Sequence, residues 1–292
     1  MRTTLIVLAA LVAACDAGDG EAAGAEGVAG SDECLSWLDG RGTDTAARPG
    51  ELRRLSASLA CFDGTFASGK GEAAGTDALE TWAAEASDER KLLVLRSHGG
   101  EAERALKIAE RLQAGGVRVL ATEVCASSCA NYPYAGLPDR HVTDGTLVLF
   151  HGGFSNVGRA MVEAGLDDLY EEHGEVIGDV EADRARVLSS YDGARVRQDA
   201  LLARAGVDAA IVHGVDGTDV ATLPAGLCGG DAALPRDFLY FAPQQASALG
   251  VAPVSGFPLT DPEAVNAAIA TRTGRTDRFV ACQAPEGFSR AG

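Results

Sequence analysis

Ser127 and His151 have the residue types and the spacing of a nucleophile and its general base. A serine hydroxyl attacks a carbonyl carbon only when a neighbouring group takes its proton, and histidine most often does so. A Ser-Ser pair such as Ser127-Ser128 is otherwise an ordinary helix N-cap. His151 favours a serine hydrolase site, because it ends an apolar run and precedes two glycines. His98 lies in a glycine turn, and the other histidines are expected at the surface: His141, His173 and His213.

Strands and one helix are predicted to position these residues. Three short apolar runs have the composition of buried strands: 92–97, 117–122 and 146–150. Residues 101–114 carry alanine, isoleucine and leucine at helical spacing and end on a glycine pair, which predicts a helix. Functional groups of a β-α-β unit gather at the carboxyl ends of its parallel strands. We therefore expect Ser127, His151 and the Gly99-Gly100 pair at one edge of the sheet.

A hydrolase of this kind needs two backbone N–H groups that bind the negative oxygen of the tetrahedral intermediate. Gly99 and Gly100 are candidates for the first group, because only glycine lets the backbone approach a carbonyl so closely. The N–H of Ser128 is the candidate for the second, at a helix start where the dipole favours negative charge. A tight turn between a strand and a helix also needs glycine, so the pair is informative through its position before this helix.

Around these residues the sequence resembles the proteolytic subunit of the Clp protease, and more closely its exported relatives, which carry a similar Cys-Ala-Ser-x-Cys. Three stretches look like the family's oxyanion, nucleophile and histidine motifs: Ser-His-Gly-Gly at 97–100, Cys-Ala-Ser-Ser-Cys-Ala at 125–130 and Leu-Val-Leu-Phe-His at 147–151. An Arg-Asp pair at 236–237, followed by a hydrophobic run and Ala-Pro, is similar to the family's acidic triad segment. The resemblance extends roughly from residue 59 to residue 251.

The resemblance implies an α/β fold of the Clp-protease and crotonase type, in which β-β-α units stack into a superhelix. It also implies a catalytic triad of Ser127, His151 and Asp237, with Gly100 and Ser128 binding the oxyanion. A carboxylate on the remote imidazole nitrogen holds the correct tautomer of the histidine. Four aspartates nearer to the histidine in the sequence remain alternatives: Asp179, Asp183, Asp192 and Asp199.

Two departures from the family pattern bear on activity. Asn131 and Pro133 stand where the family's nucleophile-bearing helix is apolar, and a proline inside a helix costs about 3 kcal/mol or forces a kink. We therefore expect this helix to be short or bent. Residues 163–219 are acidic, helix-prone and unmatched, so they are candidates for a cover over the site or for homo-oligomer assembly. The alternative function is a catalytically inactive relative that serves as a binding scaffold.

The cysteines predict disulfides. Apart from Cys15, six cysteines are present, and an even number in an exported protein indicates disulfide bonding. We favour the pairs Cys34–Cys61 and Cys125–Cys129, since a separation of four at a helix start falls within the disulfide range. Free buried thiols at 125 and 129 are the alternative. The last two candidates are left without an assigned partner: Cys228 and Cys282. No histidine stands at ligand spacing beside these cysteines, so we predict no metal site.

The amino-terminal residues predict export. In residues 1–15, Arg2 precedes an apolar run that is too short to span a bilayer stably. Residues 12–15, Val-Ala-Ala-Cys, resemble the bacterial lipobox, in which Cys15 is acylated; an ordinary cleaved signal is the alternative. Residues 16–31 are mostly glycine, alanine and glutamate with little to bury, which is typical of a flexible linker. We expect a folded domain over 32–260 and an extension over 261–292.

Composition limits the classes of partner. The chain of 292 residues is 46% hydrophobic and 23% charged, as in ordinary globular proteins. Its net charge of −17 argues against nucleic acid as a partner, since phosphates need a basic surface. The sequence thus predicts a serine hydrolase without a cofactor, lipid-anchored to the cell membrane and facing the periplasm or exterior. The expected substrate is a peptide or protein.

Overall fold

The computed structural model describes residues 28, 30–43, 48–69, 71–177, 179–218, 220–229, 234, 236–273 and 279–288. The predicted export signal, with the candidate lipidation residue Cys15, and most of the predicted linker lie outside the described residues. Within the described ranges, no helix is both long enough and apolar enough to cross a membrane.

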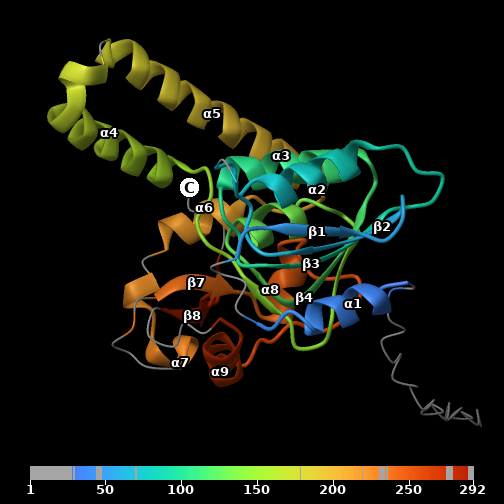
Figure 1. The fold of residues 1–292 in the computed structure, drawn as a ribbon. Coiled ribbons are helices and arrows are strands. Elements are labelled where there is room, and N and C mark those ends of the chain that lie inside the picture. The colour runs from blue at the N-terminus through green and yellow to red at the C-terminus, as the bar shows by residue number, and fades with distance from the viewer. Residues whose placement is uncertain are drawn as a thin grey trace, which may run out of the picture.

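Among the described residues, a six-stranded mixed sheet forms the centre of the molecule (Figure 1). Its strands are β1 (Glu51–Arg54), β2 (Leu59–Asp63), β3 (Leu92–Ser97), β4 (Arg118–Ala126), β5 (Arg140–Val142) and β6 (Leu147–Leu149). β1 and β2 pair antiparallel, whereas β2, β3 and β4 run parallel. β4 pairs through its first half with β5 and through its second half with β6, both parallel. The predicted strands and the α/β class are confirmed.

Helices cover both faces of this sheet, because its strands alternate apolar side chains between the two faces. On one face, Phe62 and Leu95 pack against two helices: α2 (Ala74–Ala84) and α3 (Ala102–Ala114). On the opposite face, Cys61 and Val94 pack against α1 (Asp32–Asp39). Figure 1 shows α2 and α3 above the strands and α1 below them. The helix predicted over 101–114 is therefore confirmed as the crossover between β3 and β4.

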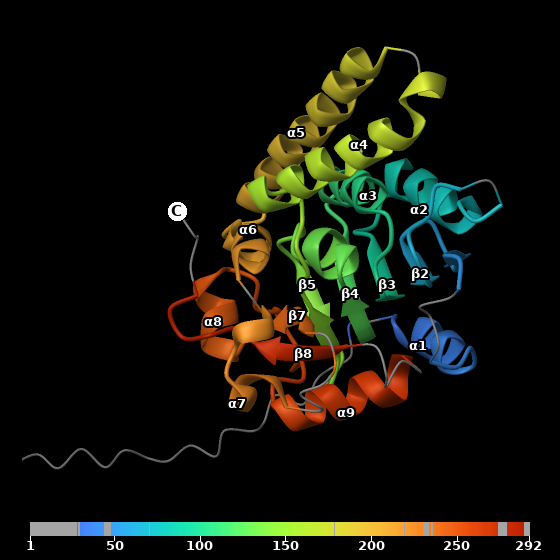
Figure 2. The ribbon, with the colours of Figure 1, turned by 90° about the vertical axis from the view of Figure 1, so that its left-hand side faces the viewer.

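Two long helices form a hairpin: α4 (Asn156–Ile177) and α5 (Val180–Arg204). The hairpin extends away from the sheet in both views (Figures 1 and 2). Leu166, Tyr170 and Leu188 form a small apolar cluster between the two helices. At the base of the hairpin, Arg197 of α5 bonds to Glu110 of α3. The segment predicted to be helix-prone, 163–219, is thus mostly helical where it is described, and α4 itself begins earlier, at Asn156, shortly after His151.

The carboxyl-terminal part forms a second, smaller layer. Within the described ranges it holds a two-stranded parallel sheet of β7 (Arg236–Tyr240) and β8 (Val280–Gln283). Its helical elements, which all follow α5, are α6 (Ala210–Gly217), η2 (Val220–Thr222), α7 (Ala225–Cys228), α8 (Pro243–Ala248) and α9 (Pro262–Thr273). A further short helix, η1 (Ala130–Tyr134), follows β4. The two sheets meet where Phe150, just after β6, exchanges two backbone hydrogen bonds with Leu239 at 2.7 and 2.9 Å.

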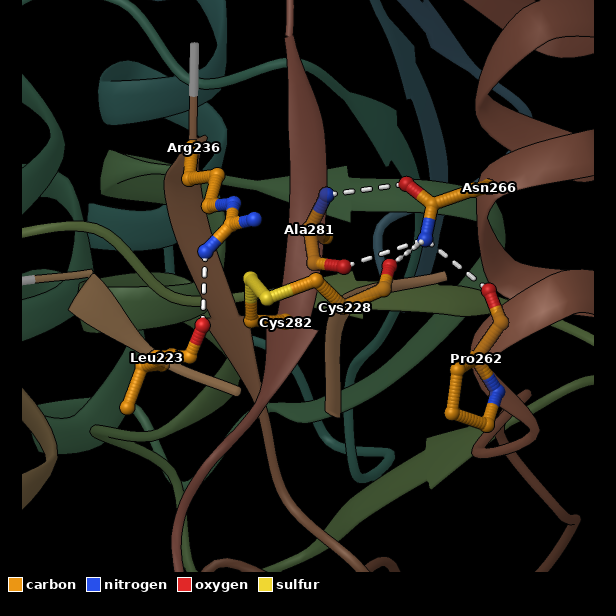
Figure 3. The surroundings of a disulfide bond; sticks show 7 residues. All are labelled: Leu223, Cys228, Arg236, Pro262, Asn266, Ala281 and Cys282. Atoms are coloured by element: carbon orange, nitrogen blue, oxygen red, sulfur yellow. Dashed lines mark hydrogen bonds between the residues drawn. A yellow bond between two sulfur atoms is a disulfide. The ribbon is translucent and has the colours of Figure 1, made fainter. Parts of the chain in front are cut away.

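Asn266 of α9 fastens β8 in place (Figure 3). Its side-chain oxygen accepts from the N–H of Ala281 at 2.9 Å, and its Nδ2 donates to the carbonyl of Ala281 at 3.1 Å. The same Nδ2 also donates to the carbonyls of Cys228 and Pro262. One asparagine therefore serves β8 as a neighbouring strand would, and residues predicted to be an extension form part of the folded body.

Three disulfide bonds join described cysteines: Cys34–Cys61, Cys125–Cys129 and Cys228–Cys282. The first links α1 to β2, and the third links α7 to β8. The two pairings favoured from the sequence are confirmed. Disulfides persist in oxidising compartments, so these bonds indicate an extracytoplasmic location.

Candidate active site

Ser127 lies at the corner between β4 and the helical segment that follows it. Its backbone has a φ of 55°, and the other non-glycine residue described with a positive φ is Glu123, at 54°. The Ser127 N–H donates to the carbonyl of Leu149 at 2.9 Å, and its carbonyl accepts from Asn131 at 2.9 Å. A non-glycine residue in this region costs about 1–3 kcal/mol, so surrounding contacts must hold it there, and such residues cluster at functional sites.

The Cys125–Cys129 disulfide encloses this corner. Both cysteines are fully buried, and they are separated by four positions. In the chain-entropy account, so short a loop gains about 2 kcal/mol, against about 4 kcal/mol for the loop closed by Cys228–Cys282. The stabilising effect of the Cys125–Cys129 bond is therefore mainly local. It fixes the conformation of the three residues that it brackets, which include Ser127 and Ser128.

The segment after the corner is a π-helix, Ala130–Tyr134, with Pro133 inside it. Pro133 has no N–H and cannot continue an α-helical ladder. The N–H of Ala135 reaches back instead to the carbonyl of Ala130 at 3.0 Å, which widens the turn. The predicted short or bent helix is confirmed.

Asn131 connects the nucleophile corner to the loop that carries His151. Its side chain is 1% exposed. Its Nδ2 donates to the carbonyl of His151 at 2.8 Å, while its own N–H donates to Ser127. Asn131, one of the two departures from the family pattern, thus ties the two predicted catalytic residues together through their backbones.

The glycine turn lies directly against the corner. Gly99 has a φ of +95°, and a Cβ there would lie 2.7 Å from the carbonyl oxygen of Ala126, 2.8 Å from the Cβ of Ser127 and 2.9 Å from the N of Ser128. No side chain fits in this space. The Oγ of Ser128 donates to the carbonyl of Gly100 at 3.0 Å and joins the two turns. The predicted glycine pair and the predicted serines are therefore brought together at one sheet edge.

Of the three residues predicted for the oxyanion hole, Gly99 differs from Gly100 and Ser128 in its hydrogen bonding. The Gly99 N–H donates to the Oγ of Ser97 at 3.0 Å, so it is already used. In the described part of the chain, no hydrogen bond uses the N–H of Gly100 or that of Ser128. Preorganised backbone donors next to a nucleophile are what an oxyanion hole needs.

His151 follows β6 and is exposed, with its ring centroid 5.3 Å from that of Phe238. Asp237 precedes Phe238 in β7 and is also exposed, at a shift in the β7–β8 register. Such bulges redirect side chains and often lie beside functional sites. Among the described residues, the side chains of Ser127, His151 and Asp237 form no hydrogen bond with one another. Catalytic hydrogen bonds often become short only when substrate is bound.

The four alternative acids have partners elsewhere, on or beside the hairpin. Asp179 caps the start of α5, and Asp183 bonds to Tyr170. Asp192 pairs with Arg159, and Asp199 bonds to the Nε2 of His213 at 2.7 Å. Each of these four carboxylates is therefore bonded to a partner other than His151. Asp237 stays the predicted acid, next to Phe238, whose ring packs against that of His151.

A buried ion network, which the sequence did not reveal, supports the strand ends beneath the site. Arg96, 1% exposed, donates to Asp63 at 2.9 Å and to Glu123 at 2.7 Å. Arg41 and Arg48 each donate to the other oxygen of Asp63 at 2.6 Å. Burial raises the pKa of the Asp63 carboxyl, but the bonds and charges of the arginines outweigh it and lower this pKa. The network fixes β3 beside the irregular part of β4 that leads to Ser127.

His141 corrects one expectation. It was expected at the surface, but it is only 9% exposed, on β5. Residues far along the chain cover it, because the segment around Ser255 adds a backbone bridge to β5. The sequence could not indicate this burial, since the covering residue is 114 positions away.

Comparison of the chain with protein-family models, with curated proteins and with solved structures found no match. Among the described residues, no group of three or more His, Cys, Asp or Glu side chains could hold a metal ion. The site must be judged from its own geometry.

Proposed function

We propose that this protein is an extracytoplasmic serine hydrolase, a peptidase, with Ser127 as its nucleophile. The observation that carries the proposal is the left-handed backbone of Ser127, held between two disulfide-bonded cysteines and against Gly99. A strained conformation is kept only where the surroundings over-determine it. Here the surroundings also present two uncommitted N–H groups and, one strand away, a histidine.

In the proposed reaction, the Oγ of Ser127 attacks the substrate carbonyl while His151 takes its proton. The N–H groups of Gly100 and Ser128 bind the oxyanion, and His151 returns the proton to the leaving amine. Asp237 orients the histidine ring. Water then repeats the cycle on the acyl-enzyme. Because His151 and Asp237 are exposed and not bonded to each other, we expect bound substrate to bring them into line.

The proposed architecture and location follow from the same residues. We propose the Clp-protease and crotonase type for the sheet, supported by the succession of β1, β2, α2, β3, α3 and β4 around the glycine turn and the nucleophile corner. Acylation of Cys15 would anchor the protein to a membrane. The second candidate function is a binding scaffold without catalysis, favoured by the exposed His151 ring, which packs at a tilt against Phe238 and is not bonded to Ser127.

Labelling with a fluorophosphonate tests the proposal, because this reagent reacts with activated serines. The full-length protein, purified in detergent in its oxidised form, is treated with the probe and mapped by mass spectrometry. We expect a stoichiometric adduct on Ser127 that is lost in Ser127→Ala and in His151→Ala. Absence of an adduct on Ser127 in folded, oxidised protein would reject the hydrolase and favour the scaffold.

Substitution of Asn131 tests the link between the two catalytic residues. Asn131→Asp keeps the shape of the side chain but removes the N–H donor to the His151 carbonyl. We expect labelling of Ser127 to become at least tenfold slower, with the free energy of unfolding lowered by about 1–3 kcal/mol. The matched control is Asn266→Asp, which removes comparable donors from the second sheet. This control should lower stability and leave the labelling rate unchanged, whereas equal labelling rates in both variants would contradict the assignment.

A further inference from the structure

A second serine, histidine and aspartate form a hydrogen-bonded chain centred on His141 of β5. The Oγ of Ser255 lies 2.8 Å from the Nδ1 of His141, and the Nε2 of His141 lies 2.6 Å from an oxygen of Asp139. The other oxygen of Asp139 pairs with Arg90 at 2.8 Å. Both ring nitrogens of the histidine are therefore engaged, one by a hydroxyl and one by a carboxylate.

In the neutral ring of His141, the two partners determine which nitrogen carries the proton. An ionised carboxylate can only accept, so the Nε2 of His141 must carry the hydrogen that Asp139 accepts. The Nδ1 of the neutral ring is then an acceptor, and the Ser255 hydroxyl must donate to it. A hydroxyl that donates to a histidine, itself oriented by a carboxylate, is the arrangement that activates serine nucleophiles.

Backbone contacts hold this chain in place, and its serine is accessible. Val142 donates to the carbonyl of Ser255 at 3.0 Å, which keeps the serine beside His141. His141 itself is buried, whereas Ser255 is partly exposed. On either side of Ser255 stand Val254, 65% exposed, and Phe257, 75% exposed. The partly exposed Ser255 thus lies on a stretch of chain that also carries two exposed apolar side chains.

This chain is separate from the proposed active site. The strand register places His141 beside Leu120, near the start of β4, whereas Ser127 follows the end of that strand. Six residues of β4, 121–126, lie between Leu120 and Ser127, which corresponds to about 20 Å of strand. The two serines can therefore react independently.

We propose that Ser255 is a second nucleophilic serine, which reacts with uncharged esters that carry an apolar group. An Oγ lone pair forms a bond to the ester carbonyl carbon while the Oγ proton moves to the Nδ1 of His141. The carbonyl electron pair moves to its oxygen and returns to expel the alkoxide, which leaves as an alcohol with the proton from His141. Water then cleaves the acyl-serine by the same steps. Val254 and Phe257 contact the apolar group, and Asp139 is a positioning residue that keeps the ring tautomer.

Labelling in a Ser127→Ala background tests this proposal without interference from the other site. The full-length protein is treated with an alkyl fluorophosphonate, whose phosphorus bonds to Oγ as fluoride leaves, and the adduct is mapped by mass spectrometry. We expect an adduct on Ser255 that is lost on adding Ser255→Ala and is at least tenfold slower with Asp139→Asn. Exposed Ser247 gives the background rate of an ordinary hydroxyl.

The outcomes separate the two serines. Labelling of Ser255 no faster than Ser247 in folded Ser127→Ala protein would overturn the proposal, and so would an unchanged rate with Asp139→Asn. If Asp139→Asn fails to fold, His141→Gln replaces it, with the same expected loss of rate. Labelling of Ser255 without labelling of Ser127 in the natural sequence would support this proposal while rejecting the proposed peptidase site.

Discussion

Gly99→Ala should abolish labelling of Ser127 and lower the free energy of unfolding by about 3 kcal/mol or more. The added methyl group would collide with the backbone of Ala126 and Ser128, within 2.9 Å, and the φ of +95° is itself unfavourable for alanine. Neither contact is the end of a flexible side chain that could move aside. The corner that carries Ser127 would have to shift, and with it the proposed oxyanion donors.

Gly116→Ala is the matched control for this experiment. Gly116 also has a positive φ, of +61°, but a Cβ there meets nothing within 4 Å. Its substitution should cost only the conformational penalty, about 1–2 kcal/mol. Urea unfolding measures the stability of both variants. Probe labelling without urea measures the reactivity of Ser127 in each of them. Equal stability and equal labelling of the two variants would show that the contact of Gly99 with the corner has no effect.

Asp63→Asn should lower the free energy of unfolding by about 3–5 kcal/mol at neutral pH. The same exchange at an exposed aspartate should cost much less. The asparagine keeps the shape of Asp63 but removes the charge that faces Arg96, Arg41 and Arg48. Because Arg96 is only 1% exposed, water cannot replace the interaction with the Asp63 charge that its guanidinium would lose. The control is Asp77→Asn, since the Asp77 side chain is 61% exposed in its pair with Arg104 and should contribute less than about 1 kcal/mol.

Acid should reduce the difference in the free energy of unfolding between the natural protein and Asp63→Asn. The folded-state pKa of Asp63 is lowered, so its charge stabilises the fold fully at pH values above the unfolded pKa of about 4. This contribution is lost as the pH falls through the folded-state pKa, below about 4. Urea unfolding at neutral pH and in that acidic range measures both differences. A difference that stays constant into acid would contradict the assigned charge of Asp63.

The elements around the proposed site could be predicted because their signals are local. Short apolar runs predict β3 and the start of β4, and helical spacing predicts α3. The glycine pair that separates β3 from α3 can be recognised without knowledge of any distant residue. The pairing of Cys125 with Cys129 could be predicted for the same reason, because the two cysteines are close in the sequence. Even the effect of Pro133 on its helix follows from the chemistry of one residue.

The remaining features depend on residues that are distant in the sequence. Arg96 reads as one polar residue at the end of an apolar strand, and nothing local shows that Asp63 and Glu123 enclose it. His141 looks like a surface residue until Ser255 is placed against it. The predicted extension 261–292 has weak local signals, so its place in the fold comes from pairing between β7 and β8 and from Asn266. Such pairings are decided by tertiary packing.

The order of the disulfides along the chain bears on how the protein matures. From Cys34 onward, each described bond joins a cysteine to the next one in the sequence: 34 to 61, 125 to 129 and 228 to 282. A chain that crosses a membrane amino end first presents its thiols in this same order. With Cys15 acylated as proposed, an oxidase that joins each new thiol to the one still unpaired would make these three bonds in turn, without an isomerase to correct errors. The linear arrangement of the bridges makes vectorial export and correct oxidation the same process.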